Sequence, residues 1–328
     1  MSLAAILDSI QTNLFRFGGP FVIINATISC ILNILVFTKP TLRKNPCSIC
    51  FIAVTIANTL YLYFVFILQV TQVGYNTDPS ITNIIYCRIR LYSSCVGNCL
   101  GPSFLILASI DRTLITSKDA GVRKRSSNRL AIICIIVLTI FWMLFHIHAF
   151  FFAEIIQVGP NLLFCFSQPG GYTVFTSYFA LVFNAIIVPL FIVIFGLWTV
   201  KNVKIVHNRV HPVGSFGNTS STVGKNQHIG SKDHQLIRML LIDILTYIIF
   251  RVPFALFLVY QQITQYQLKS NDQIAIDYFG FNITYFLFLA VAAINCYTNL
   301  LVSKTFRAEL KQTFLKCVSF CFVQQREN

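Results

Sequence analysis

Long apolar runs alternate with short polar segments along the whole chain. Each run is long enough to cross a bilayer as an α-helix, for which about 20 predominantly apolar residues suffice. The pattern predicts seven membrane-spanning helices, and a count of six stays open because the third and sixth runs contain polar residues. The predicted spans are roughly 18–38, 48–72, 85–115, 130–153, 173–201, 236–262 and 277–303.

The composition also favours a membrane protein. Hydrophobic residues make up 55% of the chain and charged residues only 11%, whereas charged residues are about a quarter of a typical soluble domain. The 11 cysteines among 328 residues are too sparse, and odd in number, for a secreted disulfide scaffold. The expected fold class is therefore all-α, an integral membrane bundle of seven transmembrane helices.

The basic residues predict the orientation. If seven helices alternate, most of the 25 lysine and arginine residues fall in the connections on one side, and the side rich in Lys and Arg faces the cytoplasm. The N-terminus is then outside and the C-terminus cytoplasmic. A net charge of +14 suits a face that lies against anionic membrane lipid and an acidic partner surface, so it is no reason to expect nucleic acid as a partner.

This orientation divides the chain into three parts. Residues 1–17 are expected to form an extracellular N-terminal segment, residues 18–303 the transmembrane domain, and residues 304–328 a cytoplasmic amphipathic helix and tail. Within the domain, the cytoplasmic connection 204–233 contains a stretch rich in Gly, Ser, Asn and His, which indicates a flexible loop.

Cys87 and the Asp111-Arg112 pair stand at opposite ends of the third apolar run. A helix from Cys87 to Arg112 would measure about 37 Å at roughly 1.5 Å per residue, and the hydrocarbon core of a bilayer is roughly 30 Å thick. The cysteine would therefore lie at one water interface and the charge pair at the other. Because disulfides form on the oxidising side of a membrane, the cysteine belongs to the outer interface.

Short motifs recur in a fixed order along the spans. They are Leu32-Asn33-Ile34-Leu35-Val36 in the first, Ala57-Asn58 in the second, Asp111-Arg112-Thr113 after the third, Trp142 in the fourth, Pro189 and Pro253 in the fifth and sixth, and Asn295-Cys296-Tyr297-Thr298-Asn299 in the seventh. Together they resemble the motifs of the rhodopsin-like family of G-protein-coupled receptors, and the resemblance covers nearly the whole chain. It implies a seven-helix bundle followed by a short eighth helix.

The resemblance implies a disulfide between Cys87 and Cys165, which lies in the external connection between the fourth and fifth spans. The bond would tie that loop over the third helix and shape the ligand entrance. The alternative is two free thiols. Cys95 and Cys99 are the other candidates for a partner, and both fall inside the membrane.

The resemblance also implies a switch at the cytoplasmic end of the third helix. Arg112 would pair with its neighbour Asp111 and with Asp233 at the start of the sixth helix. Outward movement of the sixth helix would break the second pair and open a cavity for a G protein. The alternative is an ordinary interfacial charge cluster, which contributes little energy.

Two motifs depart from the family pattern. Asn58 replaces the carboxylate that coordinates sodium in relatives, so we expect no sodium modulation. In the seventh helix, Cys296 replaces the proline and Asn299 the tyrosine, so we expect a less kinked helix, and the family's activation route does not carry over directly. Four amides could still link the first, second and seventh helices, because polar side chains within helices usually face the bundle interior; they are Asn33, Asn58, Asn295 and Asn299.

By the same resemblance, the ligand pocket is formed by the third, sixth and seventh helices, from Ser94, Asn98, Arg251, Phe254 and Tyr285. Ser94 occupies the position of the aspartate of amine receptors, and Leu289 that of the retinal-linking lysine of opsins. Both ligand classes are therefore disfavoured. Arg251 either recognises an anionic ligand or has a structural partnership with internal amides or Asp243, because a buried guanidinium is normally paired.

Beyond the seventh span, Phe306 and Leu310 recur at helical spacing among cations, which is typical of a helix lying on the inner leaflet. Cys317 and Cys321 follow it and are candidates for palmitoylation, with plain thiols as the alternative.

We therefore expect a plasma-membrane receptor that binds an extracellular ligand, with a neuropeptide favoured, and activates a heterotrimeric G protein. The alternatives are a chemosensory receptor for a small molecule, a receptor that does not use G proteins, and a seven-span transporter or channel. The sequence has no paired carboxylates, nucleophile triad, metal-ligand spacing or phosphate loop. We therefore expect no enzyme activity, cofactor or metal.

Overall fold

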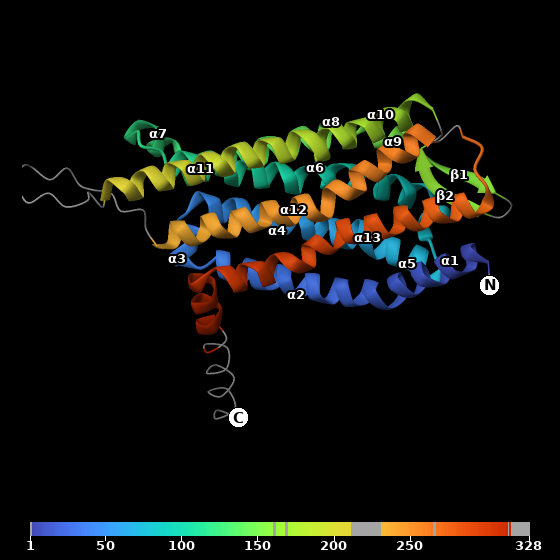
Figure 1. Ribbon diagram of the computed structural model, residues 1–328, viewed down its shortest axis with the longest axis horizontal. Helices are drawn as coiled ribbons and strands as arrows, with labels where there is room; N and C mark the ends of the chain where they lie inside the picture. The colour runs from blue at the N-terminus through green and yellow to red at the C-terminus, as the bar shows by residue number, and fades with distance from the viewer. Residues whose placement is uncertain are drawn as a thin grey trace, which may run out of the picture.

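The computed structural model describes residues 2–159, 162–167, 170–210, 231–264, 267–313 and 315. Seven of its helical segments are long and apolar enough to cross a membrane, and they run side by side along one axis (Figure 1). The predicted fold class is confirmed, and the six-span alternative is wrong. Polar residues in the middle of these runs, such as Ser103, Asp243 and Arg251, are buried within the continuous helices α6 (Ile84–Ile115) and α12 (Ser231–Thr264).

The first three spans differ in how regular they are. The first consists of α1 (Leu3–Asn13), the π-helical turn η1 (Leu14–Gly18) and α2 (Gly19–Phe37). The second consists of α4 (Pro46–Tyr61), the π-helical turn η2 (Leu62–Phe66) and α5 (Ile67–Tyr75). The third is the single helix α6 (Ile84–Ile115).

The remaining spans complete the bundle. The fourth is α8 (Asn128–Phe145) with α9 (His148–Phe152). The fifth is α10 (Gly171–Ala180), the π-helical turn η4 (Leu181–Ile187) and α11 (Val188–Val210). The sixth is α12 (Ser231–Thr264) and the seventh α13 (Asn271–Val302). Short connecting helices are α3 (Pro40–Arg43), η3 (Pro79–Ile81) and α7 (Ala120–Arg125).

The first helix begins at Leu3, well before the predicted start near residue 18. Ser2 caps it, since its hydroxyl accepts a hydrogen bond from the Ala5 amide at 3.4 Å. Gln11 is buried and accepts a hydrogen bond from Asn282 at 3.0 Å. This contact with α13 holds the helical turns before residue 18 against the bundle.

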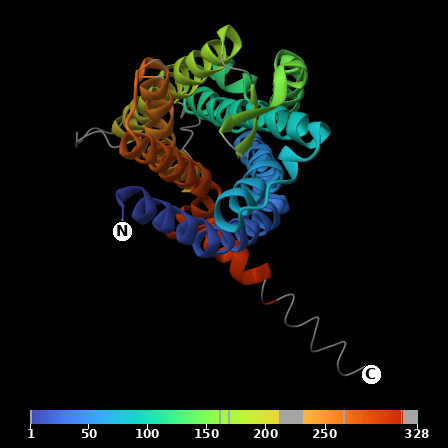
Figure 2. The same cartoon turned by 90° about the vertical axis from the view of Figure 1, so that its right-hand side faces the viewer.

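The two ends of the bundle carry different structures. One end carries the antiparallel hairpin of β1 (Ala153–Gly159) and β2 (Leu162–Ser167), in which Ile155 pairs with Cys165. The chain begins at this hairpin end, and α3 and α7 lie at the opposite end, called here the α7 end (Figure 1). Figure 2 shows the helices arranged in a ring when seen from the hairpin end.

Small residues let the helices approach closely. A Cβ at Gly97 of α6 would lie 2.4 Å from the Tyr61 ring, and one at Gly280 of α13 would lie 2.6 Å from Phe257. The outer faces carry exposed apolar side chains such as Ile136 and Val137 of α8. Such faces are suited to contact with lipid tails.

Residues 304–313 form a further helix that turns away from the axis of the bundle at the α7 end (Figure 1). Ser303 begins it, because its hydroxyl accepts a hydrogen bond from the Phe306 amide at 3.1 Å. The ring of Phe306 is buried, with its centroid 5.7 Å from that of Phe37. This is the predicted eighth helix. The candidate lipidation residues Cys317 and Cys321 lie outside the described residues.

Candidate functional site

At the hairpin end, a disulfide joins Cys87 near the start of α6 to Cys165 in β2, with a Cα–Cα distance of 5.4 Å. This confirms the predicted pairing and excludes two free thiols. Cys95 and Cys99 are not disulfide-bonded, and Cys99 instead lies 3.3 Å from Nε2 of His146. The bond fixes the hairpin against the third span.

Beside the disulfide, a chain of hydrogen bonds joins four helical segments. Gln69 of α5 donates to Asn282 of α13 at 3.4 Å, and Asn282 donates to Gln11 of α1 at 3.0 Å. Arg90 of α6 donates to Gln69 at 2.8 Å and forms an ion pair with Asp78 at 3.0 Å. The side chain of Asn282 is fully buried. We call these five residues the hairpin-end network.

Sequence reasoning missed the hairpin-end network. Arg90 is only one helical turn beyond Cys87, so it could have been assigned to the same interface. Its partners come from positions far apart along the chain, and no spacing rule brings them together. The network ties the first, second, third and seventh spans to one another.

Deeper in the bundle, the predicted pocket residues Phe254 and Tyr285 pack together with ring centroids 4.9 Å apart. Phe288 joins them, at 5.2 Å from Phe254. Ser94 and Asn98 are partly buried on α6. The buried Oδ1 of Asn98 has no hydrogen-bond partner within the described part of the chain, so an acceptor is available to a ligand or water there.

Arg251 lies on the inner face of α12, one helical turn from Phe254 in the direction of the α7 end. Its guanidinium carbon is 4.5 Å from the ring centroid of Phe288 and 5.4 Å from that of Tyr247. Both distances are within the range of a cation–π interaction. Among the described residues, no ion pair joins Arg251 to Asp243. Aromatic faces therefore stabilise this buried cation.

Arg251 and Asp243 line the same small cavity of about 30 Å³, together with Asn58. Nη1 of Arg251 and Oδ1 of Asp243 are buried and have no hydrogen-bond partner within the ranges that the structure describes. A polar cavity of this size holds one or two water molecules. Water can therefore satisfy both groups across the cavity.

The four expected amides do not all come together. Asn299 of α13 donates to Asn33 of α2 at 3.1 Å, which links the seventh span to the first. Asn58 of α4 lines the small cavity, and no hydrogen bond joins it to Asn33 or Asn299 within the described residues. The side chains of Asn295 and Cys296 are outside the part of the chain that the structure describes.

At the α7 end, Arg112 is fully buried and donates to Asp111 at 2.8 Å. Its guanidinium also donates to the side chain of Asn45, which caps α4. The second carboxylate oxygen of Asp111 accepts from the Ser126 hydroxyl at 2.5 Å. The side chain of the expected partner Asp233 lies outside the described residues.

Asn45 and Ser126 were not identified from the sequence. Asn45 precedes Pro46, which is a helix-start pattern, but that pattern indicates a cap and says nothing about Arg112. Removing one partner of a buried ion pair typically costs about 3–5 kcal/mol. The Asp111–Arg112 pair is therefore an energetically significant junction between the second span, the third span and the following loop.

The next residue joins the third span to the fifth. The Thr113 hydroxyl donates to the Phe195 carbonyl at 3.0 Å and lies 3.0 Å from the Thr199 hydroxyl. Asn202 of α11 donates to the Thr113 carbonyl at 3.3 Å. A displacement of α11 would therefore act on the residue next to Arg112.

Compared with models of protein families, the chain matches that of the 7 transmembrane receptor (rhodopsin family) over residues 29–299. The chain belongs to this family, which confirms the resemblance found in the sequence. It is a multi-pass membrane protein and a receptor of the G-protein-coupled class, and such receptors in general respond to an extracellular ligand and are typically not enzymes. A search of curated proteins gave no match.

Proposed function

We propose that the protein is a plasma-membrane receptor that binds an extracellular ligand and activates a heterotrimeric G protein. The buried Asp111–Arg112 pair at the α7 end carries this proposal. Both residues lie in α6, but Arg112 also donates to Asn45 and Asp111 accepts from Ser126, so a movement of neighbouring elements can break these outer contacts. Activation then consists of outward movement of α12, which opens a cavity for the G protein beside Arg112.

The orientation is part of the proposal. The disulfide lies at the hairpin end, and disulfides form in oxidising compartments. The last turn of α7, at the opposite end, contains Arg123, Lys124 and Arg125. Clusters of basic residues next to membrane spans favour the cytoplasmic side. Both features support an extracellular N-terminus and a cytoplasmic α7 end.

The aromatic cluster and Arg251 offer a route between a ligand and α12. Phe288 of α13 contacts both the Phe254 ring and the Arg251 guanidinium. Pro253 lies inside α12 between those two residues, and a proline within a helix removes one backbone hydrogen bond and favours a bend. A ligand that displaces Tyr285 or Phe288 would therefore act on α12 at its most deformable point.

We propose a neuropeptide as the ligand, with a small chemosensory molecule as the second candidate. Ser94 and Leu289 leave no anchor for a biogenic amine or retinal. A displacement of Tyr285 or Phe288, as proposed above, would open the small cavity and let a ligand carboxylate reach Nη1 of Arg251, which has no hydrogen-bond partner within the described residues. A transporter requires a pathway of ionisable groups, and the cavity of about 30 Å³ that contains Asp243 and Arg251 is far too small for one.

A paired screen tests this function. Cells expressing the receptor are exposed to peptide and small-molecule libraries, with calcium and cyclic AMP as readouts. The control cells express Arg112→Ala at matched surface density. We expect at least one ligand whose response is lost in the control. A ligand that binds both forms and signals equally through both would contradict G-protein activation through Arg112.

A further inference from the structure

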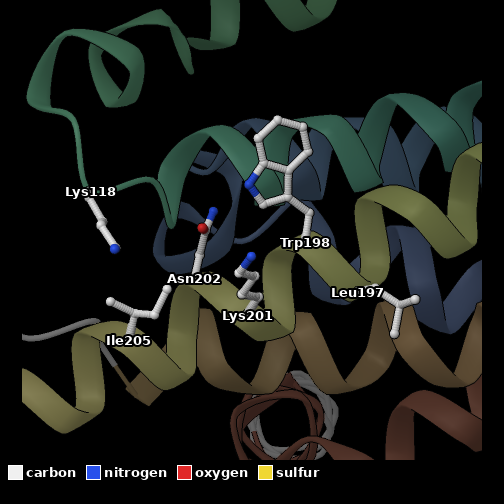
Figure 3. A pocket seen from close by; sticks show the side chains of 6 residues that line it. All are labelled: Lys118, Leu197, Trp198, Lys201, Asn202 and Ile205. Carbon is white, nitrogen blue, oxygen red and sulfur yellow. The ribbon is translucent and has the colours of Figure 1, made fainter.

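A hollow on the outer wall of the bundle lies at the α7 end, between α11 and the segment that follows α6. Its volume is about 420 Å³. It differs from the site described above because it opens outward, and Asn202 is the one lining residue that also takes part in that site. Its lining consists of Lys118, Leu197, Trp198, Lys201, Asn202 and Ile205 (Figure 3).

The polar groups of this hollow come from two segments. Figure 3 shows the ammonium group of Lys201 and the indole nitrogen of Trp198 next to the Asn202 amide, with Lys118 on the neighbouring segment at the other side of that amide. None of the lining residues is acidic. Asp119, which follows Lys118 in the sequence, accepts a hydrogen bond from the Gly121 amide at 2.8 Å and caps α7.

The hollow has a fixed frame. Asn202 is 7% exposed and donates to the Thr113 carbonyl at 3.3 Å and to the Thr116 hydroxyl at 3.4 Å. Arg123 donates to the carbonyls of Ser117 and Lys118 at 2.9 Å each. The backbone that carries Lys118 is therefore held against α7, so this lysine faces the hollow from a defined position.

The surroundings of the hollow match a membrane interface. Leu197 is 66% exposed and Trp198 54% exposed on the outer face of α11. Tryptophan is enriched at the boundary between lipid and water, and lysine extends its ammonium group toward headgroups while its stem stays in apolar surroundings. Under the orientation proposed above, this boundary belongs to the cytoplasmic leaflet, which is rich in anionic lipid.

We propose that the hollow binds the headgroup of an anionic phospholipid of the cytoplasmic leaflet. Headgroup phosphate oxygens accept hydrogen bonds from Lys118, Lys201 and the Trp198 indole, and the acyl chains lie along Leu197 and Ile205. The lipid joins α11 to the loop before α7. Because Asn202 also binds Thr113, the residue after Arg112, the bound lipid stabilises the contact of the fifth span with the switch region.

The two tryptophans of the chain allow a direct test. Trp142 is buried and Trp198 exposed. Subtracting the fluorescence emission of the Trp198→Phe variant from that of the wild type therefore isolates the signal of Trp198 in the hollow. The receptor is reconstituted in phosphatidylcholine nanodiscs with increasing phosphatidylinositol bisphosphate. We expect a saturable change in the difference spectrum. The double variant Lys118→Gln with Lys201→Gln should bind the lipid roughly thirtyfold more weakly, since each lysine near a lipid surface contributes about a factor of five to the affinity.

Two further variants keep the test decisive. Lys304→Gln with Lys311→Gln removes the same charge from the eighth helix and should leave the lipid titration unchanged. Lys118→Arg with Lys201→Arg should retain binding and confirm folding. The site would be overturned if the wild type showed no spectral change on lipid titration. It would also be overturned if the glutamine pair in the hollow and the pair in the eighth helix weakened lipid binding equally. Equal binding of soluble inositol phosphate would overturn the assignment to lipid.

This test is independent of signalling. Both leaflets of a nanodisc contain the lipid, so binding needs neither the proposed orientation nor a G protein. Antibody access to N-terminal and C-terminal tags on intact cells tests the orientation separately. Lipid binding with an inverted topology would leave the site intact and contradict only its assignment to the cytoplasmic leaflet.

Discussion

The guanidinium of Arg251 lies 4.5 Å from the ring centroid of Phe288, deep between the sixth and seventh spans. A charged side chain within a membrane bundle is costly unless it is paired. Here an aromatic face is the observed partner. Since Phe288 also contacts Phe254, the cation and the proposed ligand pocket share one side chain.

We expect Arg251 and Phe288 to be energetically coupled. Replacing Arg251 by Gln and Phe288 by Leu, singly and together, should give a coupling free energy of about 1–2 kcal/mol in thermal unfolding of the purified receptor. The control is Phe281→Leu, which alters the same cluster through Phe254 and Tyr285. Additive effects of Arg251→Gln and Phe288→Leu would show that the cation–π contact contributes nothing.

The disulfide should be essential for the hairpin. Cys87→Ser or Cys165→Ser should abolish surface expression or the ligand response, since loss of a native disulfide typically costs about 2–5 kcal/mol. The double variant should resemble either single variant. Cys134→Ser changes a free cysteine and serves as the control. Normal surface density and signalling in the Cys87→Ser receptor would contradict this role.

The hairpin-end network should stabilise the bundle. Asn282→Ala removes two hydrogen bonds of a fully buried amide and leaves their partners unsatisfied, so unfolding should become easier by about 1–3 kcal/mol. Asn25→Ala is the control, because Asn25 is only partly buried and accepts its bond from Tyr297 in an exposed position. Similar melting temperatures for both variants would argue against a stabilising network.

Sodium should have no effect on this receptor. Asn58 contributes an amide where relatives have a carboxylate, and the Arg251 guanidinium in the same cavity opposes the charge of its remaining carboxylate, Asp243. Replacing sodium by N-methylglucamine should therefore leave ligand affinity and melting temperature unchanged. Asn58→Asp adds a second carboxylate to the cavity beside Asp243 and tests whether the assay detects a sodium effect. A clear sodium dependence of the wild type would refute the prediction.

The sequence was most informative where one local pattern determines the structure. Apolar runs predicted the seven spans, and the resemblance around Cys87 and Cys165 predicted their disulfide. The early start of α1 was missed because contact with Asn282 in α13 stabilises it. Asn45, Ser126 and Arg90 were missed because their partners lie in other elements, and hydrogen-bonded networks of this kind depend on tertiary packing.

The most direct test of the account concerns the junction at Arg112. Asn45→Ala and Ser126→Ala each remove a partner of the Asp111–Arg112 pair, and Asp233→Ala removes the partner expected on α12. Ligand-independent G-protein activation is measured by energy transfer between labelled Gα and Gβγ at matched receptor density, with Ser127→Ala as the control. We predict a severalfold rise in basal activation for Asn45→Ala, Ser126→Ala and Asp233→Ala, and none for the control. Basal activation equal to that of the wild type in all three variants would contradict a switch at Arg112.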